Sequence, residues 1–442
     1  MSRRGARSWL VVAVVALSTM LLSTPARADM VTEWNQLAAT ALTGDGQGSS
    51  AVVQLAMVHA AMYDAVNAID RRYEPYLVEP KAKRWYSQDA AAATAAYRVL
   101  VDSKPPVIEN LMHQAALFAN AKSLYDASLA AIPPGAAKDG GIATGNAAAD
   151  AMIAARTNDG RFGPFRFSVG TLPGVWRPVP LLFINDPFAW VRDVKPFLID
   201  SSSQFGGPPP YPLTSRRYAQ EFKEVKSLGA LNSTTRTQDE TDAARFWGAT
   251  NAVATWSSLY RDIAQRYGRS LSDNARMFAM LYLAGADTAI TVWVDKAKYS
   301  FWRPITAIQL ADTDGNPLTT ADPNWMPLVN TPPYPEMPSG LSSLSGASAT
   351  TLQHFFGTDD LAFGITNAIG IERNYASFSQ AEQEVINARV WAGIHFRHAD
   401  EVGAAIGEQI ARWQQERFLQ PVENDDNNDQ GNNNNGNDQN QQ

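Results

Sequence analysis

Three short segments in the last third of the chain gather cations, a hydroxyl and a histidine. Lys296 and Arg303 lie seven residues apart in the first segment, Pro338-Ser339-Gly340 forms the second, and Arg389 and His395 lie six residues apart in the third. Together these groups can hold a tetrahedral oxyanion, because cations and hydrogen-bond donors stabilise its negative oxygens and the planar fork of arginine binds two of them at once. The histidine adds a nitrogen that can act as a nucleophile.

The second segment, Tyr334 to Gly346, is a turn rich in Pro, Gly and Ser that precedes a helical run predicted over 347–356. A turn of this kind points backbone N–H groups and the Ser339 hydroxyl at whatever lies on the helix N-terminus, and this geometry favours an anion. Most Pro-Ser-Gly sequences are turns without a ligand. The prediction of an anion site therefore depends on the two cationic segments that flank the turn.

Lys296 and Arg303 are two helical turns apart, so both can face the same point. Lys298 is the competing lysine, but on a continuous helix it would point about 140° away from Arg303. The alternative is that these cations are solvated at a helix end. Trp302 and Pro304 favour an enclosed site, because a surface arginine rarely needs such stiff neighbours.

Arg389 and His395 do not share a face of an ideal helix, so the segment is predicted to end or bend between them. His398 is the nearest competitor of His395. The other three histidines lie in helical patterns typical of packed or half-exposed residues: His59, His113 and His354. No pair of histidines has the spacing of a zinc-binding helix, so a divalent metal site is not expected.

The first 28 residues have the pattern of a secretory signal peptide. Arg3, Arg4 and Arg7 precede an apolar run over 9–22, and Ala26-Arg27-Ala28 supplies small residues at a cleavage site. The apolar run is shorter than the roughly 20 residues that a membrane span needs. Cleavage after about Ala28 would make the protein secreted or periplasmic.

The charge balance and the cysteine content exclude several classes of protein. Residues 1–28 hold four of the 37 basic residues and none of the 44 acidic ones, so the net charge from residue 29 on is −11. This acidity argues against nucleic acid and anionic membrane surfaces as partners. The absence of cysteine excludes disulfides, zinc–thiolate sites and cysteine nucleophiles. No later apolar run is predicted to be long enough to cross a bilayer, so no membrane anchor is predicted.

The body of the chain is predominantly helical in pattern, and β-branched alternation is almost absent, so an all-α fold is predicted. Helices are expected over 51–70, with an apolar stripe, and over 87–101, 107–131, 141–156, 237–247, 273–293, 379–396 and 400–418. Three of the helix starts are marked by Ser272 and by two capping boxes, Thr237 with Glu240 and Ser379 with Glu382. Residues 160–214, rich in Pro, Gly and aromatics, are expected to form a long irregular segment that belongs to a binding surface.

One all-α domain is predicted over 29–423, with the oxyanion site in its C-terminal half, 273–418. From Asn424 to Gln442 the chain contains only Asn, Asp, Gln and Gly. Such a segment has no apolar surface to bury, so it is predicted to be a disordered tail.

The three segments, in this order, resemble the Lys-x6-Arg-Pro, Pro-Ser-Gly and Arg-x5-His pattern of the vanadium-dependent haloperoxidases, which type 2 phosphatidic acid phosphatases and bacterial acid phosphatases share. Here the pattern reads Lys296, Arg303-Pro304, Pro338-Ser339-Gly340, Arg389 and His395. Residues 58–68, 301–308 and 393–397 also resemble secreted bacterial haloperoxidase-like proteins, so the resemblance covers most of the chain. It implies an all-α fold of helix bundles, with the anion site in the core of one bundle.

The resemblance also implies a role for each residue of the pattern. Lys296, Arg303 and Arg389 would bind the equatorial oxygens of vanadate, or of phosphate in its place, and the Ser339 hydroxyl and Gly340 N–H would complete the cradle. His395 would supply the axial nitrogen, bonded to vanadium in a peroxidase and attacking phosphorus in a phosphatase. A peroxidase of this family would use hydrogen peroxide to oxidise a halide or another small-molecule substrate.

Two positions depart from the family pattern. Leu341 stands where relatives carry the acid–base histidine of Pro-Ser-Gly-His, and a leucine cannot move a proton. Ala399 stands where relatives place an aspartate four residues after the axial histidine, and Asp400 follows it. The sequence therefore predicts a vanadium haloperoxidase-like protein, with activity reduced by Leu341. An acid phosphatase and a non-catalytic oxyanion-binding protein are the alternatives.

Overall fold

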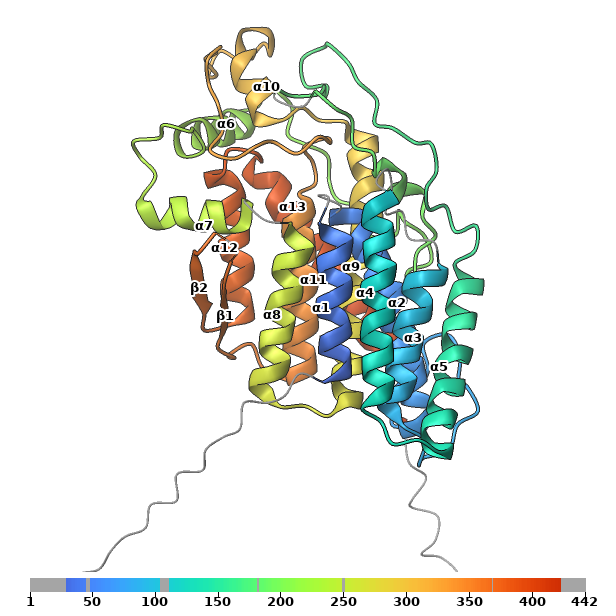
Figure 1. The fold of residues 1–442 in the computed structure, drawn as a ribbon. Coiled ribbons are helices and arrows are strands. Elements are labelled where there is room, and N and C mark those ends of the chain that lie inside the picture. Colours follow the sequence, from blue (N-terminus) through green and yellow to red (C-terminus); the bar gives the residue numbers. More distant parts are fainter. Residues whose placement is uncertain are drawn as a thin grey trace, which may run out of the picture.

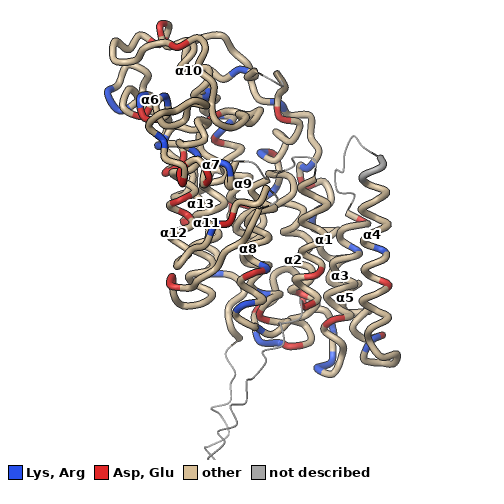
Figure 2. Tube along the Cα trace, turned by 60° about the vertical axis from the view of Figure 1, so that its left-hand side comes forward, with Lys and Arg blue, Asp and Glu red and all other residues tan. Residues whose placement is uncertain are grey.

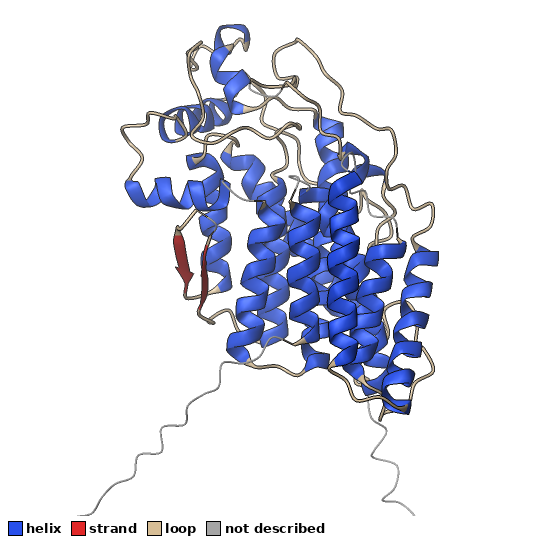
Figure 3. Ribbon diagram, in the orientation of Figure 1, coloured by secondary structure: helices blue, strands red, loops and turns tan. Residues whose placement is uncertain are grey.

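The computed structural model describes residues 29–44, 48–103, 111–180, 183–248, 251–367 and 369–422. The predicted signal peptide and the predicted tail from residue 424 lie outside these residues. The described part is mainly α-helical, with one antiparallel hairpin of strands β1 (Phe363–Thr366) and β2 (Glu372–Tyr375) at its edge (Figure 3). The predicted all-α fold is confirmed.

The long helices pack side by side in two groups (Figure 1). The first group consists of α1 (Met30–Thr43), α2 (Gly48–Asp70), α3 (Gln88–Asp102), α4 (Leu111–Ala130) and α5 (Ala136–Ala155). The second group consists of α8 (Ala252–Tyr267), α9 (Leu271–Tyr299), α11 (Gly340–Phe356), α12 (Phe378–Trp391) and α13 (Arg397–Arg417). Helix α2 packs against α9, so these two helices join the groups.

Shorter elements and loops cover one end of the second group. They are η1 (Ala189–Asp193), α6 (Arg216–Leu228), α7 (Gln238–Gly248), α10 (Pro304–Gln309) and η2 (Ala311–Thr313). Figure 2 shows that both signs of charge occur in these loops and at the opposite end of the bundle.

Helices α2 and α9 form the centre of the molecule. Every residue of α2 from Ser49 to Ile69 is buried, so the predicted one-sided apolar stripe was wrong. Both helices are long and apolar enough to cross a membrane, so the prediction that no later apolar run is long enough for this was wrong. The most apolar stretches of α2 and α9 are 100% and 94% buried inside the protein. This burial accounts for the apolar composition of the two helices.

The irregular segment over 160–214 is confirmed, apart from the short turn η1. Buried Asp287 on α9 fixes it by accepting the backbone N–H groups of Phe197, Leu198 and Ile199 at 2.6–2.9 Å. Burial raises the pKa of Asp287 to about 6, against the pull of these three donors. The segment is thereby held against the same helix that carries Lys296.

Several helix boundaries differ from the sequence predictions. Ser270, not Ser272, caps α9, and Ser377, not Ser379, caps α12. The capping box of Thr237 with Glu240 is confirmed, with reciprocal bonds of 2.7 and 3.2 Å. The helix expected over 347–356 begins seven residues earlier, at Gly340. This shift places the Pro-Ser-Gly turn directly at a helix N-terminus.

Helices α11 and α13 approach each other closely because α13 has glycines where they cross. A Cβ atom on Gly407 would lie 2.0 Å from the Ser343 carbonyl oxygen, and one on Gly403 would lie 2.5 Å from that of Ser339. These obstacles are backbone atoms, which cannot rotate away as a side chain can. The position of the α11 N-terminus therefore depends on these glycines.

We expect Gly407→Ala to destabilise the protein by about 1–3 kcal/mol, the usual cost of overpacking, because α11 and α13 must separate. Urea unfolding followed by circular dichroism measures this loss. Ala405 is exposed on the same helix, so Ala405→Ser should change stability by less than about 0.5 kcal/mol. Equal stability of the two variants would contradict the packing argument.

Candidate active site

The six residues predicted from the sequence meet at one end of the second group of helices. Lys296 lies in the last turn of α9 and Arg303 caps α10, while Ser339 and Gly340 begin α11. Arg389 lies in the last turn of α12, and His395 lies in the link to α13. The five side chains among them are at most 6% exposed. Three buried cations in one place require an anion or buried acids for compensation.

Each of the two cationic segments changes direction between its two site residues. Helix α9 ends at Tyr299 and Ser300 adopts a left-handed conformation, so Lys296 and Arg303 are not on one continuous helix as predicted. Helix α12 ends at Trp391, which confirms the bend predicted before His395. Gly393 makes this bend with φ 79°, and a Cβ atom there would lie 2.4 Å from the Gly229 carbonyl oxygen.

His395 is held by a glutamate that the sequence analysis did not select. Its Nδ1 lies 3.0 Å from Glu336 Oε1, and the Phe396 N–H donates to the same oxygen at 3.0 Å. Its Nε2 lies 3.0 Å from Nη1 of Arg303, which can only donate. Nδ1 therefore carries the imidazole proton and donates it to Glu336, while the Nε2 lone pair faces the cations.

The electrostatics of this pair follow from its burial among charges. Burial, followed by the charges of Arg303, Lys296 and Arg389, holds the pKa of His395 well below its usual range. Burial also raises the pKa of Glu336 to about 8, although Arg303 and the Phe396 N–H oppose this rise. His395 is thus a neutral imidazole, and a neutral imidazole is the form that can act as a ligand or a nucleophile.

Arg303 connects the turn, the histidine link and the centre of the site. Its Nε donates to the Tyr334 carbonyl at 2.8 Å and its Nη1 to the Ile394 carbonyl at 2.9 Å. Its Nη2 is buried without a hydrogen-bond partner among the described residues. Burial lowers the pKa of Arg303 to about 10, so the guanidinium remains charged at neutral pH.

Lys296 has a different environment from the one its predicted role implies. Its ammonium donates to the carbonyls of Pro335, Glu336 and Pro338, which use all three of its protons. Burial, followed by the charge of Arg303, holds the pKa of Lys296 well below its usual range. In this arrangement Lys296 folds the turn before α11 and contributes its charge to the site. Lys298, the competing lysine, is exposed.

Arg389 completes the cationic group. Its Nη1 donates to the Trp247 carbonyl at 3.2 Å, while its buried Nε finds no partner in the described part of the chain. A buried arginine N–H without a partner is costly. Together with Arg303 Nη2, it is an unused donor of the kind that an oxyanion would satisfy, so the residues present fit vanadate or phosphate.

The N-terminus of α11 is fixed by a chain of buried hydroxyls. Ser339 Oγ donates to Ser342 Oγ at 3.1 Å, and Ser342 Oγ donates to Asp400 Oδ1 at 2.8 Å. The Ser339 N–H donates to the Ala399 carbonyl at 2.9 Å. Burial raises the pKa of Asp400 to about 7. Asp400 therefore positions the α11 turn, whereas Glu336 fills the role of orienting the histidine.

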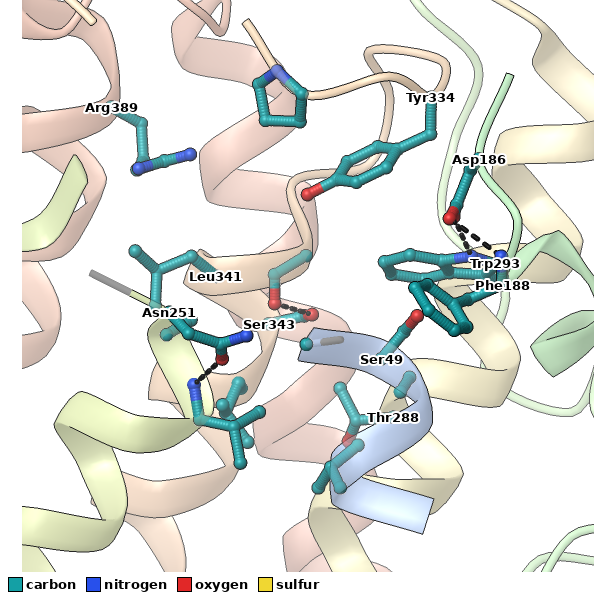
Figure 4. A pocket seen from close by; sticks show the side chains of 18 of the residues that line it. Ser49, Asp186, Phe188, Asn251, Thr288, Trp293, Tyr334, Leu341, Ser343 and Arg389 are labelled. Carbon is teal, nitrogen blue, oxygen red and sulfur yellow. Dashed lines mark hydrogen bonds between the residues drawn. The ribbon is translucent and has the colours of Figure 1, made fainter. Parts of the chain in front are cut away.

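A cavity of about 280 Å³ lies directly beside the site (Figure 4). Arg389, Tyr334 and Gly340 belong to its wall, and so does Leu341, at the position of the expected acid–base histidine. Among the described residues no histidine lines it: His354 lies near the other end of α11, and His398 stacks on Tyr211 at 4.0 Å. Neither of these histidines can therefore take the place of the acid–base histidine that relatives carry at the position of Leu341.

Asp186 is the one carboxyl group in the described lining of this cavity. Its Oδ2 accepts from the Trp293 Nε1 at 3.1 Å and its Oδ1 from the Phe188 N–H at 2.9 Å. Burial raises the pKa of Asp186 to about 6. Within the described residues, no group of three or more His, Cys, Asp and Glu side chains is gathered as a metal site.

We expect Glu336→Ala to weaken orthovanadate binding by about 10- to 100-fold, because partners that orient a ligand histidine typically contribute this much. Glu336→Gln should restore part of the loss, since its amide oxygen can accept the Nδ1 proton. Equilibrium dialysis gives the dissociation constants. Glu221 accepts the His398 N–H at 3.0 Å but is not bonded to His395, so Glu221→Ala is the matched control. Equal losses in both alanine variants would contradict the orienting role.

Sequence comparison finds a known family in the C-terminal part of the chain. Residues 276–424 match the family model described as the VCPO second helical-bundle domain. The vanadium chloroperoxidase of Curvularia inaequalis is 29% identical over 152 residues, which cover 29% of this chain and 24% of that protein. The matched region thus spans about a quarter of the length of this curated relative.

Solved structures extend the likeness to most of the chain. A bacterial vanadium-dependent iodoperoxidase superposes with a TM-score of 0.76 at 22% identity, covering 89% of this chain and 97% of its own. A holo-type bacterial vanadium-dependent chloroperoxidase gives 0.65 at 17% identity, covering 89% and 93%. The resemblance to the vanadium haloperoxidase superfamily is therefore confirmed, in fold along most of the chain and in sequence over residues 276–424.

Proposed function

We propose that this protein is a vanadium-dependent haloperoxidase, which binds vanadate in the buried cradle and oxidises halide with hydrogen peroxide. The observation that carries the proposal is the pair of unused arginine donors, Arg303 Nη2 and Arg389 Nε, buried beside the His395 imidazole. Bound vanadate supplies the activation of hydrogen peroxide. The relatives in sequence and fold, named as vanadium chloroperoxidases and a vanadium-dependent iodoperoxidase, support this choice.

Each residue then has a defined task. Arg303, Arg389 and the Gly340 N–H compensate the negative oxygens, and the Ser339 hydroxyl would turn its proton from Ser342 Oγ to the oxyanion. Lys296 adds positive charge and holds the turn. His395 presents its Nε2 lone pair because Glu336 fixes its proton on Nδ1.

Leu341 should limit the rate of this reaction. General acid–base catalysis typically contributes about 10²- to 10⁴-fold, and the cavity wall provides no imidazole for it. The signal peptide pattern in residues 1–28 supports a secreted or periplasmic location, where the protein would meet halide and peroxide from outside the cell.

A halide oxidation assay tests the proposal. The protein from residue 29 on is stripped of metal and given hydrogen peroxide with iodide, bromide or chloride, with and without orthovanadate, over a range of pH. We expect slow, vanadate-dependent oxidation of at least one halide, which disappears in His395→Ala. No oxidation of any halide by folded protein at any pH would reject it. Hydrolysis of a phosphate monoester inhibited by vanadate would instead assign a phosphatase.

A further inference from the structure

The cavity beside the cradle extends well beyond the oxyanion site. It reaches residues on four helices that begin or pass here: α2, α8, α9 and α11. Its volume of about 280 Å³ is nearly twice that of an engineered apolar cavity of about 150 Å³ that binds benzene. A tetrahedral oxyanion alone would leave most of this space unfilled.

The wall of the extension combines apolar side chains with the uncharged polar side chains of Ser49, Asn251, Thr288 and Ser343. Aliphatic side chains come from Val52 on α2, Val253 on α8, and Leu341 and Leu344 on α11. Gly285 on α9 lies between two of them, since a Cβ atom there would lie 3.1 Å from Leu344 and from Val52. Aromatic rings line the side toward the irregular segment and the turn: Phe188, Trp247, Trp293 and Tyr334.

The same cavity is polar where it meets the cradle. Arg389 and the N-terminal Gly340 of α11 face it there, and Figure 4 shows Arg389 and Tyr334 on one side with Leu341 between them and the deeper part. Exposed Asn330 and the half-exposed Pro332 also belong to the lining, so the cavity is connected to the surface. The cavity is therefore open to a ligand that has one charged end and one apolar end.

We propose that this cavity binds the aromatic ring of a small organic substrate directly beside the oxyanion cradle. Leu341 is central to the proposal, because it joins the aliphatic wall to the cradle where a histidine would place a polar ring. The inference rests on the proposed function, since the cradle must hold the oxyanion beside which the ring lies. It assigns the substrate class as compounds with a single substituted ring, for which shape and apolar contact give most of the affinity.

Three probes that share one anionic head test the proposal: inorganic phosphate, methylphosphonate and phenylphosphonate, measured by titration calorimetry. Phosphate reports on the cradle alone. We expect phenylphosphonate to bind at least about tenfold more tightly than methylphosphonate, because its ring is buried against apolar walls. Equal affinities for the two phosphonates, with phosphate bound, would overturn the ring site and leave the cradle intact.

Substitution of two different alanines by phenylalanine locates the site. Ala289 is half-buried on α9 and lines the cavity, so Ala289→Phe should reduce the preference for phenylphosphonate to near one. Ala254 is half-buried on α8 and does not belong to the described lining, so Ala254→Phe should keep the full preference. A preference that survives Ala289→Phe would place the ring elsewhere and reject the proposal.

If the proposed function is wrong, the three probes give a different set of binding results. If folded wild-type protein binds none of the three probes, the cradle does not hold an oxyanion, and toluene then tests the cavity directly. Thermal stabilisation by toluene in the wild type but not in Ala289→Phe supports the ring site. No stabilisation of the wild type would overturn it.

Discussion

Replacement of Arg303 by glutamine should weaken orthovanadate binding on the order of a hundredfold or more. The variant loses the charge, the unused Nη2 donor and the Nη1 donor, which would turn from His395 Nε2 to an oxygen of the bound oxyanion. Charge-assisted hydrogen bonds contribute about 1.5–3 kcal/mol each, and two of them correspond to at least about 10²-fold in affinity. Arg303→Lys should give an intermediate loss, because it keeps the charge without the planar fork.

Arg276 provides the matched control for this prediction. It is also buried, near the opposite end of α9, where it donates to the Leu419 carbonyl at 3.0 Å. Arg276→Gln should lower the free energy of unfolding without changing the dissociation constant of orthovanadate by more than about threefold. If both glutamine variants weaken binding equally, the loss reflects damaged folding and Arg303 is not part of the cradle.

Replacement of Leu341 by histidine should raise vanadate-dependent halide oxidation by up to about 10²- to 10⁴-fold. Leu341 lies on the cavity wall next to Gly340, the first residue of α11, so a histidine there would place an imidazole beside the bound oxyanion. Burial and the nearby cations should lower the pKa of this imidazole, as they do for His395, so the neutral imidazole is already present at neutral pH and the gain should fall on acidification. Initial rates over a pH series measure the effect.

Leu344 is the control for Leu341. It lines the same cavity one turn further along α11, so Leu344→His makes the same chemical change away from Gly340. This second variant should not gain activity. A rise in both variants, or in neither, would show that the position after Pro-Ser-Gly does not limit turnover in this protein.

The sequence predicted the main components of the site from their residue types and their order in three short segments, and not from a shared helix. Lys296 and Arg303, Ser339 and Gly340, and Arg389 and His395 all lie at the same end of the second group of helices. Their meeting depends on bends at Ser300 and Gly393, and only the second of these was predicted. A glycine inside a helical pattern is a local signal, whereas a left-handed serine depends on its tertiary surroundings.

Glu336 could not be selected from the sequence by spacing alone. It is separated from His395 by 59 residues, and its contact arises only when the turn folds around Lys296. The available signal was a single acid in an otherwise uncharged, proline-rich turn. Such a residue must be paired if the turn is buried.

The early start of α11 was missed because Gly340 and the serines after it have low helix propensity. Packing against the glycines of α13 overrides this preference, since Gly403 and Gly407 allow the two backbones to approach. The same packing places the Ser339 cap and the Gly340 N–H at the cradle. Local propensity therefore failed at the point where the site requires a helix N-terminus.

A crystal structure of the protein with orthovanadate is the most direct test of the central claim. We expect vanadium density bonded to Nε2 of His395, with its oxygens within hydrogen-bonding distance of Arg303 and Arg389. Phosphate in excess should displace it. Crystals in which the protein binds no vanadate at this site, or binds it away from His395, would contradict the assignment of this cradle as the catalytic centre.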